Sequence, residues 1–419
     1  MRNENVKPID ILWNTIGTCT YAIVSLVLSI VIINIAGKTE GGIFTFGFST
    51  LARLAFTLTF FGIRPMHIVD IQYKYSFSDY IHFGLKMAVL SVLIGLVFII
   101  YKLIDGNYSF VKSVILLILI AHGSLDGFAD YYECEFQRSN KLYMCGQSLF
   151  FRISLFTVSL IVVLILTSNL IFAEIFAIIV ELIVFYFFNI VRSKNIFKTV
   201  KLHDKFARDR RLFIDALPLF LITFLDMAIF SLSKIFVDSN LGDVYSGFYG
   251  LTFMPTNAIY LLMTLFMKPI LTPLSNAYLN NKREYNSILM SSFLFAVVLS
   301  IIAIIATIFL SKVYFSILYY LTNTDYVEFS SVANNILLTV IVGGCFYTLC
   351  TPFYFSLIVE NKQIYLLISY ILVFVASPFI VRYYVISLGI IGAAYGFAVS
   401  MFLIFIGVLI AKILSIIIR

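Results

Sequence analysis

Charged residues are scarce in this chain, and their scarcity limits what kind of protein it can be. Only 12% of its 419 residues are charged, whereas 61% are hydrophobic, and the mean hydropathy is +1.01. So little polar surface cannot cover a soluble globule of this size. The composition therefore excludes a soluble globular protein and predicts an integral membrane protein.

Cysteine is also rare, and its pattern excludes several kinds of site. The five cysteines, Cys19, Cys134, Cys145, Cys345 and Cys350, show no paired spacing, and most fall in apolar runs or near the expected cytosolic face. A phosphate-binding loop is missing too: residues 37–39 (GKT) resemble its end, but Ile32 stands where the loop needs its first glycine. We therefore expect no disulfide framework, no metal site, no cofactor and no ATP hydrolysis.

What the chain does have is a series of long apolar runs. A helix needs ~20 mostly apolar residues to span a hydrocarbon core of ~30 Å. Twelve runs of this length are present, at residues 10–36, 43–64, 80–102, 110–131, 142–167, 170–191, 213–237, 245–272, 286–311, 330–358, 363–382 and 388–415. The strands of a membrane barrel are shorter, at ~10 residues, and alternate in polarity. The sequence therefore predicts an all-α polytopic membrane protein with twelve transmembrane helices.

One basic stretch, residues 192–212, divides these runs into two sets of six. It predicts an N-terminal six-helix bundle over residues 1–191, a linker, and a C-terminal six-helix bundle over residues 213–419. Because lysine and arginine concentrate in cytosolic loops, the linker should be cytosolic. The same side receives Lys74, Arg138, Lys141, Lys282, Arg283 and Lys362, which predicts that both termini are cytosolic. The net charge of +7 then reflects topology and attraction to anionic membrane lipids, so no nucleic-acid partner is expected.

Short matches between the two halves suggest an internal repeat. Ile9-Asp10 and Ile214-Asp215 open the halves, Gly42 and Gly247 follow at the same offset, and Arg64-Pro65 and Lys268-Pro269 come at nearly the same distance further on. Genuine duplication and chance agreement both fit so few matches. Since both halves should begin in the cytosol, a true repeat would be parallel and would close around a central cavity.

Several basic residues lie where lipid should be. A charge near the bilayer centre costs roughly 2.5 to 3.5 kcal/mol on insertion scales, so it normally faces a cavity or a partner. Arg53 falls near the middle of the second run, too deep to reach the headgroups easily. Together with Arg64, Arg152, Lys234 and Lys268 it would give a cationic, substrate-binding interior. For each residue, a salt bridge or a side chain that extends to the headgroups explains the charge without a binding role.

Acidic residues form a second intramembrane set. His122, Asp126 and Asp130 recur every four residues and so share one face of the fourth run, and Asp226 lies in the middle of the seventh. Such a set suits the coupling of transport to an ion gradient. A cytosolic funnel, or ion pairing of the stripe with Arg152, explains the pattern equally well.

Three prolines, Pro255, Pro269 and Pro273, fall in the eighth run and should break its helix. A broken helix in a transporter can form a hinge or a binding site, because the freed backbone groups need partners or water. A static kink filled by packing is the alternative.

Two stretches of the sequence resemble a known family. Residues 60–81 (FFGIRPMHIVDIQYKYSFSDYI) resemble the first cytosolic loop of the Wzx-like polysaccharide-biosynthesis flippases, members of the multidrug/oligosaccharidyl-lipid/polysaccharide (MOP) exporter superfamily. Residues 130–152 are similar to the connection between helices 4 and 5 of these proteins, with Gln137, Leu142, Gly146, Ser148 and Arg152 at familiar places. The two stretches cover about a tenth of the chain, and the six-plus-six division extends the likeness over the rest.

This resemblance implies a V-shaped, MATE-like pair of six-helix bundles that moves an undecaprenyl-pyrophosphate-linked oligosaccharide to the outer leaflet by alternating access. It also implies a place in the bacterial cytoplasmic membrane, a role in O-antigen, capsule or exopolysaccharide synthesis, and polysaccharide polymerase and chain-length proteins as partners. In the family, helices 1, 2, 7 and 8 line the cavity and carry basic residues for the pyrophosphate. Arg53, Arg64, Lys234 and Lys268 match this by helix placement alone.

Two other functions stay open. A multidrug or cation antiporter of the same superfamily would bind cations through buried carboxylates, but the first run has no carboxylate beyond Asp10 at its mouth. A membrane polysaccharide polymerase would need a large external loop with clustered charged residues, whereas the largest outside stretch runs from about Lys312 to Glu328. The sequence therefore favours a flippase that is not an enzyme.

Overall fold

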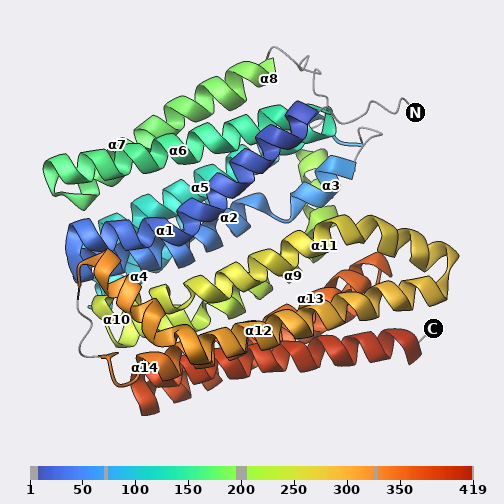
Figure 1. Cartoon of the computed structure of the whole chain (residues 1–419). Helices are drawn as coiled ribbons and strands as arrows, with labels where there is room; N and C mark the ends of the chain where they lie inside the picture. Colours follow the sequence, from blue (N-terminus) through green and yellow to red (C-terminus); the bar gives the residue numbers. More distant parts are fainter. Residues whose placement is uncertain (1–7, 70–73, 195–204, 325–328, 418–419) are drawn as a thin grey trace. The chain divides into compact units, whose positions relative to one another are not determined.

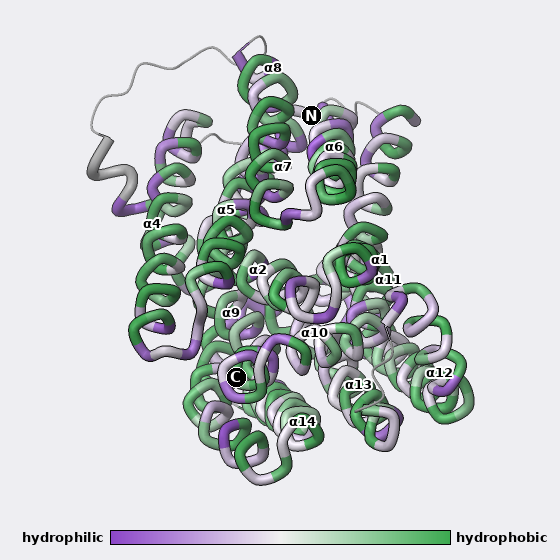
Figure 2. The backbone as a smooth tube through the Cα atoms, turned by 90° about the vertical axis from the view of Figure 1, so that its left-hand side faces the viewer, coloured by the Kyte–Doolittle hydropathy of each residue, from purple (hydrophilic) through white to green (hydrophobic). Residues whose placement is uncertain are grey.

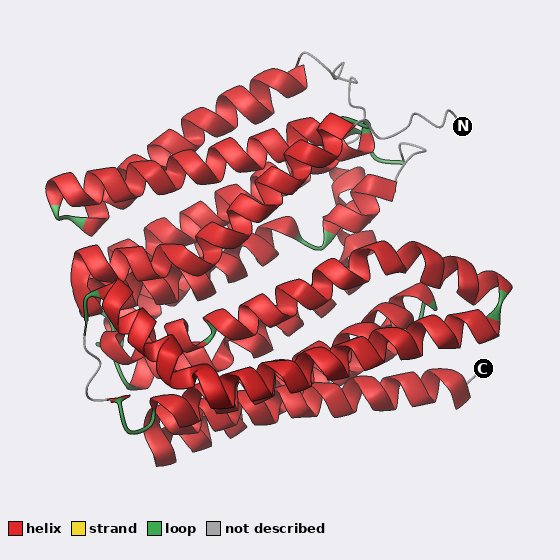
Figure 3. Cartoon of the chain, viewed as in Figure 1, coloured by secondary structure: helices red, strands yellow, loops and turns green. Residues whose placement is uncertain are grey.

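Helix is the regular secondary structure throughout the part of the chain that the computed structural model describes, residues 8–69, 74–194, 205–324 and 329–417 (Figure 3). Each of the twelve predicted segments lies almost entirely in helix. Ten helical spans of the described residues are long and apolar enough to cross a membrane, and two of these, Pro8–Ile68 and Gln363–Ser415, each hold two predicted segments. The predicted all-α, polytopic fold class is confirmed.

The chain divides into two compact units between Phe224 and Leu225, inside a long helix. Before this helix, the elements in chain order are α1 (Pro8–Phe46), the π-helix η1 (Gly47–Leu51), α2 (Ala52–Phe60), α3 (Ile63–Val69), α4 (Phe77–Ile104), α5 (Phe110–Arg138), α6 (Leu142–Thr167), α7 (Leu170–Phe185), the π-helix η2 (Tyr186–Val191) and α8 (Arg192–Lys194) (Figure 1). The long helix is α9 (Lys205–Asn240), and α10 (Asp243–Thr252), α11 (Met254–Asn280), α12 (Lys282–Thr322), α13 (Ala333–Val359) and α14 (Gln363–Ile417) follow it. Of the predicted basic linker, residues 195–204 lie outside the described residues, and the division at this linker stays a prediction.

Two pairs of predicted segments are joined by kinks inside single helices. Gly37 in α1 has φ 84° and ψ 178°, and Gly389 in α14 has φ 62° and ψ −136°. Residues with a Cβ avoid these backbone conformations, whereas glycine adopts them readily. The chain can therefore reverse direction at these two residues without a longer loop.

The second and eighth segments depart from the sequence-based expectation. The second breaks at Phe61 and Gly62, both at positive φ, so Arg64 lies on the separate helix α3 rather than on the end of α2. In the eighth, the helix breaks at Phe253, two residues before the first proline, and α11 then continues through Pro269 and Pro273. The expectation that all three prolines break this helix is wrong for the last two. The stretch after Lys312, expected as an outer loop, is helical as far as Thr322.

Each unit packs around its fourth predicted segment. In unit 1, α5 contacts α2, α3, α4, α6 and α7, and in unit 2, α13 contacts α10, α11, α12 and α14. In their most apolar windows, α5 and α13 are 61% and 67% buried, against 39% or less for every other span of the described residues. The third segments, α4 and α12, are the least buried, at 11% each, and Figure 2 shows apolar residues along most of their length. This matching order of burial supports a repeat of six helices.

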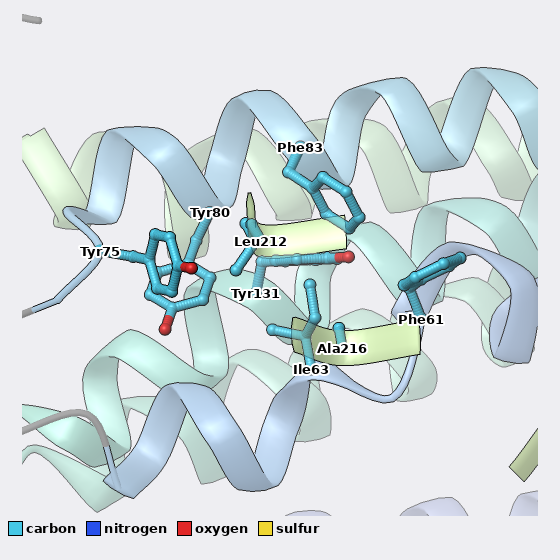
Figure 4. Packing of buried hydrophobic residues seen from close by; sticks show 8 residues of the cluster. All are labelled: Phe61, Ile63, Tyr75, Tyr80, Phe83, Tyr131, Leu212 and Ala216. Atoms are coloured by element: carbon cyan, nitrogen blue, oxygen red, sulfur yellow. The ribbon is translucent and has the colours of Figure 1, made fainter. Parts of the chain in front are cut away.

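The first half of α9 belongs to unit 1, where it closes an aromatic cluster (Figure 4). The cluster consists of Phe61, Ile63, Tyr75, Tyr80, Phe83, Tyr131, Leu212 and Ala216, and the last two come from α9. Phe61 also stacks on Phe220, with ring centroids 4.0 Å apart. At the edge of this cluster, Lys74 and Tyr75 donate hydrogen bonds of 2.5 and 2.7 Å to Asp215, and the bond from Lys74 raises the pKa of its ammonium group. The stretch of residues 60–81, which resembles the flippase loop, is thus joined to α9 by the hydrogen bonds of Lys74 and Tyr75.

Candidate functional site

A stripe of buried titratable residues runs along α5. His122, Asp126, Asp130 and Glu133 are all between 3% and 6% exposed. The first three share a face as the sequence predicts, and Glu133 continues the line by three residues. Because α5 is the central helix of unit 1, this face meets other helices rather than lipid, and every charge on it needs a partner.

Arg152 on α6 is the main partner of this stripe. Its guanidinium forms an ion pair with Asp126 and lies 3.0 Å from Glu133 Oε1 and 3.5 Å from Glu181 Oε1 on α7. The side chain is 2% exposed. Ion pairing with Arg152, one of the alternatives that the sequence left open, is therefore what the structure shows for Asp126. A guanidinium enclosed by three carboxylates has little charge left for a substrate.

His122 and Asp130, at the two ends of the predicted stripe, have partners of their own. His122 Nδ1 lies 2.7 Å from Glu181 Oε2, and its ring stacks on Phe156 with centroids 4.1 Å apart. Asp130 forms an ion pair with Arg64, whose guanidinium also donates to Gln137 over 3.3 Å. Arg64, which the sequence placed in a cationic interior, thus has its charge compensated by α5, although its side chain stays 35% exposed.

Carboxylates outnumber cations in this network. Asp126, Asp130, Glu133 and Glu181 face Arg64 and Arg152, with His122 as the remaining titratable group. Uncompensated charge is strongly disfavoured in a low-dielectric interior. The network therefore has the composition of a group that binds protons, which suits the coupling role predicted for His122, Asp126 and Asp130.

Arg53 differs from the ion-paired Arg64 and Arg152 in its surroundings. It lines a small hollow between the helices of unit 1, together with Tyr21, Ser25, Phe48, Phe56, His122 and Asp126 among others. Its guanidinium stands 4.9 Å from the centroid of the Tyr21 ring, and no carboxylate of the described residues lies within ion-pair distance of it. Of the three arginines that the sequence singled out, Arg53 is the one whose charge is available to a bound anion.

Close backbone packing places Arg53 beside the network. A Cβ on Gly123 of α5 would lie 2.1 Å from the carbonyl oxygen of Ala52, so only glycine lets α2 approach this closely. The π-helix η1 ends one residue before Ala52, and π-helical turns inside helices are frequent at functional sites. Both features fix the turn that carries Arg53.

The two predicted lysines belong to unit 2. Lys234 on α9 is 4% exposed, and its ammonium nitrogen lies 4.3 Å from the centroid of the Phe253 ring. The side chain of Lys268 lies outside the described residues, although its backbone continues α11. The structure thus brings Arg53, Arg64 and Arg152 together in unit 1 and leaves the lysines in the other unit.

Asp226 lies among tyrosine side chains in unit 2. Tyr347 donates a hydrogen bond of 2.5 Å to its Oδ2, whereas Oδ1 has no hydrogen-bond partner among the described residues. The ring of Tyr260 packs at a tilt against that of Tyr347, with ring centroids 4.8 Å apart. No cation within ion-pair distance accompanies Asp226 in the described residues, so this carboxyl can bind a proton or a small cation. Groups of three or more potential metal ligands are absent from the same residues.

Sequence reasoning missed two buried glutamates of this site. Glu181 and Glu133 complete the surroundings of Arg152, yet neither was singled out. A signal was present for Glu181, because it interrupts the apolar run of α7, where the cost of a buried charge applies as it does to Arg53. Glu133 lies near the end of its run, where a position at the membrane surface explains a charge equally well.

Comparison with known proteins identifies the fold. No family model matches the sequence, and no curated protein matches it. Among solved structures, the lipid II flippase MurJ in an inward closed conformation is similar with a TM-score of 0.68 and 16% identity, over 97% of this chain and 91% of that chain. A multidrug resistance MATE family transporter of the MOP superfamily in an inward-facing conformation gives a TM-score of 0.64 and 14% identity, over 97% of both chains. The MATE multidrug transporter DinF-BH gives a TM-score of 0.62 and 16% identity, over 99% of this chain and 96% of that chain.

These similarities extend over nearly the whole of each chain. The protein therefore has the fold that MATE transporters and the MurJ flippase share, which agrees with the fold that the sequence resemblance implied. At these identities the likeness concerns the fold, and the substrate has to be argued from the residues.

Proposed function

We propose that this protein is a flippase that moves undecaprenyl-pyrophosphate-linked oligosaccharide repeat units across the bacterial cytoplasmic membrane by alternating access. Its products would serve the synthesis of a surface polysaccharide such as O-antigen, capsule or exopolysaccharide. Polysaccharide polymerase and chain-length proteins would then act on the same pathway. The role involves transport without a chemical reaction.

The observation that carries this proposal is the position of Arg53. A pyrophosphate headgroup cannot cross hydrocarbon unaided. It requires a cation that faces a hollow and has no carboxylate of its own within ion-pair distance. Arg53 meets that requirement among the described residues, and Arg64, which is partly exposed, pairs with the same stripe of α5. The aromatic rings of Tyr21, Phe48 and Phe56 in the hollow suit stacking on sugar rings.

Two further features support this assignment. One solved structure with the same fold is described as a lipid II flippase, so the fold can accommodate the movement of a lipid-linked sugar. The apolar surfaces of α4 and α12 would let the polyprenyl tail stay in lipid while the polar headgroup passes through protein. Asp226, and the network of His122, Asp126 and Asp130, are the proposed sites of coupling to an ion gradient.

A complementation assay tests the proposal. The chain is expressed in a bacterium whose own oligosaccharide-lipid flippase is deleted, and surface polysaccharide is measured for the wild type and for Arg53→Ala. We expect the wild type to restore polysaccharide and Arg53→Ala to leave it at background. Restoration by the alanine variant at equal membrane levels would contradict the assigned role of Arg53.

One observation favours a second candidate, a multidrug or cation antiporter. Asp226 is a buried carboxyl with one oxygen that lacks a hydrogen-bond partner among the described residues, and the tyrosine rings around it suit an organic cation. A drug-efflux assay on the same strain separates the two functions. Efflux that depends on Asp226 but not on Arg53 would favour the antiporter.

A further inference from the structure

Glu174 on α7 is a buried carboxyl group that the site described above does not use. It is 1% exposed, and neither of its carboxylate oxygens has a hydrogen-bond partner among the described residues. Glu181 lies seven residues further along the buried face of the same helix, but its carboxylate contacts both His122 and Arg152. The two glutamates thus have similar burial and opposite surroundings.

The charged group that acts on Glu174 within the described part of the chain is a further carboxylate. Glu40 on α1, which is partly buried, is the charged group that interacts with it, and no lysine, arginine or histidine of the described residues lies within ion-pair distance of its carboxylate. A carboxylate without a cation, without a hydrogen-bond donor and with a negative neighbour is strongly disfavoured in an apolar interior. The neutral acid satisfies the same position at far lower cost, since it carries no net charge.

We propose that Glu174 is a proton-binding site, which takes up a proton at the end of unit 1 where α7 begins. In the predicted topology this end faces the outside, and Glu40, which is more exposed, is the group through which the proton arrives. The step is a proton transfer from external water by way of the Glu40 carboxylate to a carboxylate oxygen of Glu174, which becomes a neutral acid. The role of this proton in driving transport rests on the proposed function, whereas its binding does not.

Distance separates this site from the network around Arg152. Seven residues along a helix correspond to a rise of about 10 Å, too far for direct proton transfer between Glu174 and Glu181. Glu174 is therefore a distinct site near one end of α7, and the network deeper in unit 1 is a second group of titratable residues.

Infrared spectroscopy of the purified full-length protein tests proton binding directly. We expect the wild type at neutral pH to show the carbonyl stretch of protonated carboxylic acids, and the difference spectrum between the wild type and Glu174→Gln to isolate one such band, which belongs to Glu174. Glu284→Gln, which changes an exposed acid on α12, is the matched control and should keep the band. Glu174→Asp should retain a band at a shifted frequency, which identifies its source. A wild-type spectrum without the band at any pH, or an unchanged band in a folded Glu174→Gln, would overturn the assignment.

Transport then tests whether the proton is used. In the complementation strain, Glu174→Gln is permanently neutral and should reduce surface polysaccharide to background, although the protein reaches the membrane. Normal polysaccharide from this variant would overturn the role in coupling and leave the infrared result as it stands. Failure of the wild type itself to restore polysaccharide would instead count against the proposed function, and the spectrum would still decide whether Glu174 binds a proton.

Discussion

The guanidinium of Arg152 forms a buried ion pair with the carboxylate of Asp126, so that α6 is joined to α5 in the interior of unit 1. The same guanidinium reaches Glu181 on α7, so one side chain connects three helices. In this position Arg152 acts as a structural residue first, because its removal would leave several buried carboxylates without their cation.

Arg152→Ala should therefore lower the stability of the protein. Breaking a buried pair by removing one partner costs about 3–5 kcal/mol. Thermal unfolding in detergent should show a large decrease in melting temperature. Lys74→Ala removes the exposed pair with Asp215 and is the control, with an expected loss below about 1 kcal/mol. Equal effects of the two substitutions would contradict the buried network.

The ion pair of Lys74 and Asp215 also allows a prediction of how stability depends on pH. The hydrogen bond to Asp215 raises the pKa of the Lys74 ammonium, so the pair contributes its stability below the unfolded-state value of about 10.4 and loses it only as the pH rises through the higher folded value. We expect wild type and Lys74→Ala to differ by the same small amount at pH 6 and pH 8. If the difference in stability between wild type and Lys74→Ala disappeared between pH 6 and pH 8, a group other than Lys74 would control this ion pair.

Arg53→Ala should impair substrate binding without impairing folding. Loss of a hydrogen bond to a charged group costs about 1.5–3 kcal/mol, which corresponds to roughly a 10- to 150-fold weaker binding of the pyrophosphate group. Binding of a fluorescent polyprenyl-pyrophosphate to purified protein measures this change. Arg53→Lys keeps the charge and should lose less. Wild-type affinity in Arg53→Ala would exclude a pyrophosphate site in this hollow.

Asp226→Asn should alter energy coupling, because it removes the ionisable group and keeps the shape of the side chain. Tyr347→Phe is the control, since it removes the hydrogen bond to the carboxyl and leaves the charge. The measurement is transport with and without collapse of the proton or sodium gradient. A sensitivity to both gradients identical to that of the wild type would show that Asp226 has no role in coupling.

Gly123→Ala should disturb the contact that positions Arg53. The new Cβ would lie 2.1 Å from the carbonyl oxygen of Ala52, and a backbone atom cannot move aside as a side chain can. We expect a loss of about 1–3 kcal/mol and weaker pyrophosphate binding. Gly407→Ala, where the nearest atom is the Ser369 Cβ at 3.2 Å, should cost less. Unchanged stability in Gly123→Ala would mean that α2 and α5 are not in such close contact.

Apolar run length was sufficient to locate the membrane helices. The run at residues 142–167 coincides with α6, because charged or polar residues bound it at both ends. The break at Phe61 and Gly62 was not predictable in the same way, since the apolar run continues through it and the break depends on packing against α9. Local sequence sets where a helix can form, and tertiary contacts decide where it bends.

The partners of the buried charges could not be predicted from spacing. The stripe from His122 to Asp130 follows from helical periodicity, but its partners Arg64, Arg152 and Glu181 come from three other helices. Their positions depend on how the helices pack. Glu174 could have been recognised as an unusual residue in an apolar run, but only the structure shows that it differs from Glu181 in having no partner among the described residues.

Direct observation of lipid translocation tests the central claim. The purified protein is reconstituted in vesicles that contain a fluorescent undecaprenyl-pyrophosphate-linked oligosaccharide, and a membrane-impermeant quencher reports how much of it reaches the outer leaflet. A flippase should make the protected half of the fluorescence accessible, and Arg53→Ala vesicles should behave like vesicles without protein. Translocation by the wild type no faster than in protein-free vesicles, with an ion gradient imposed, would contradict the proposed function.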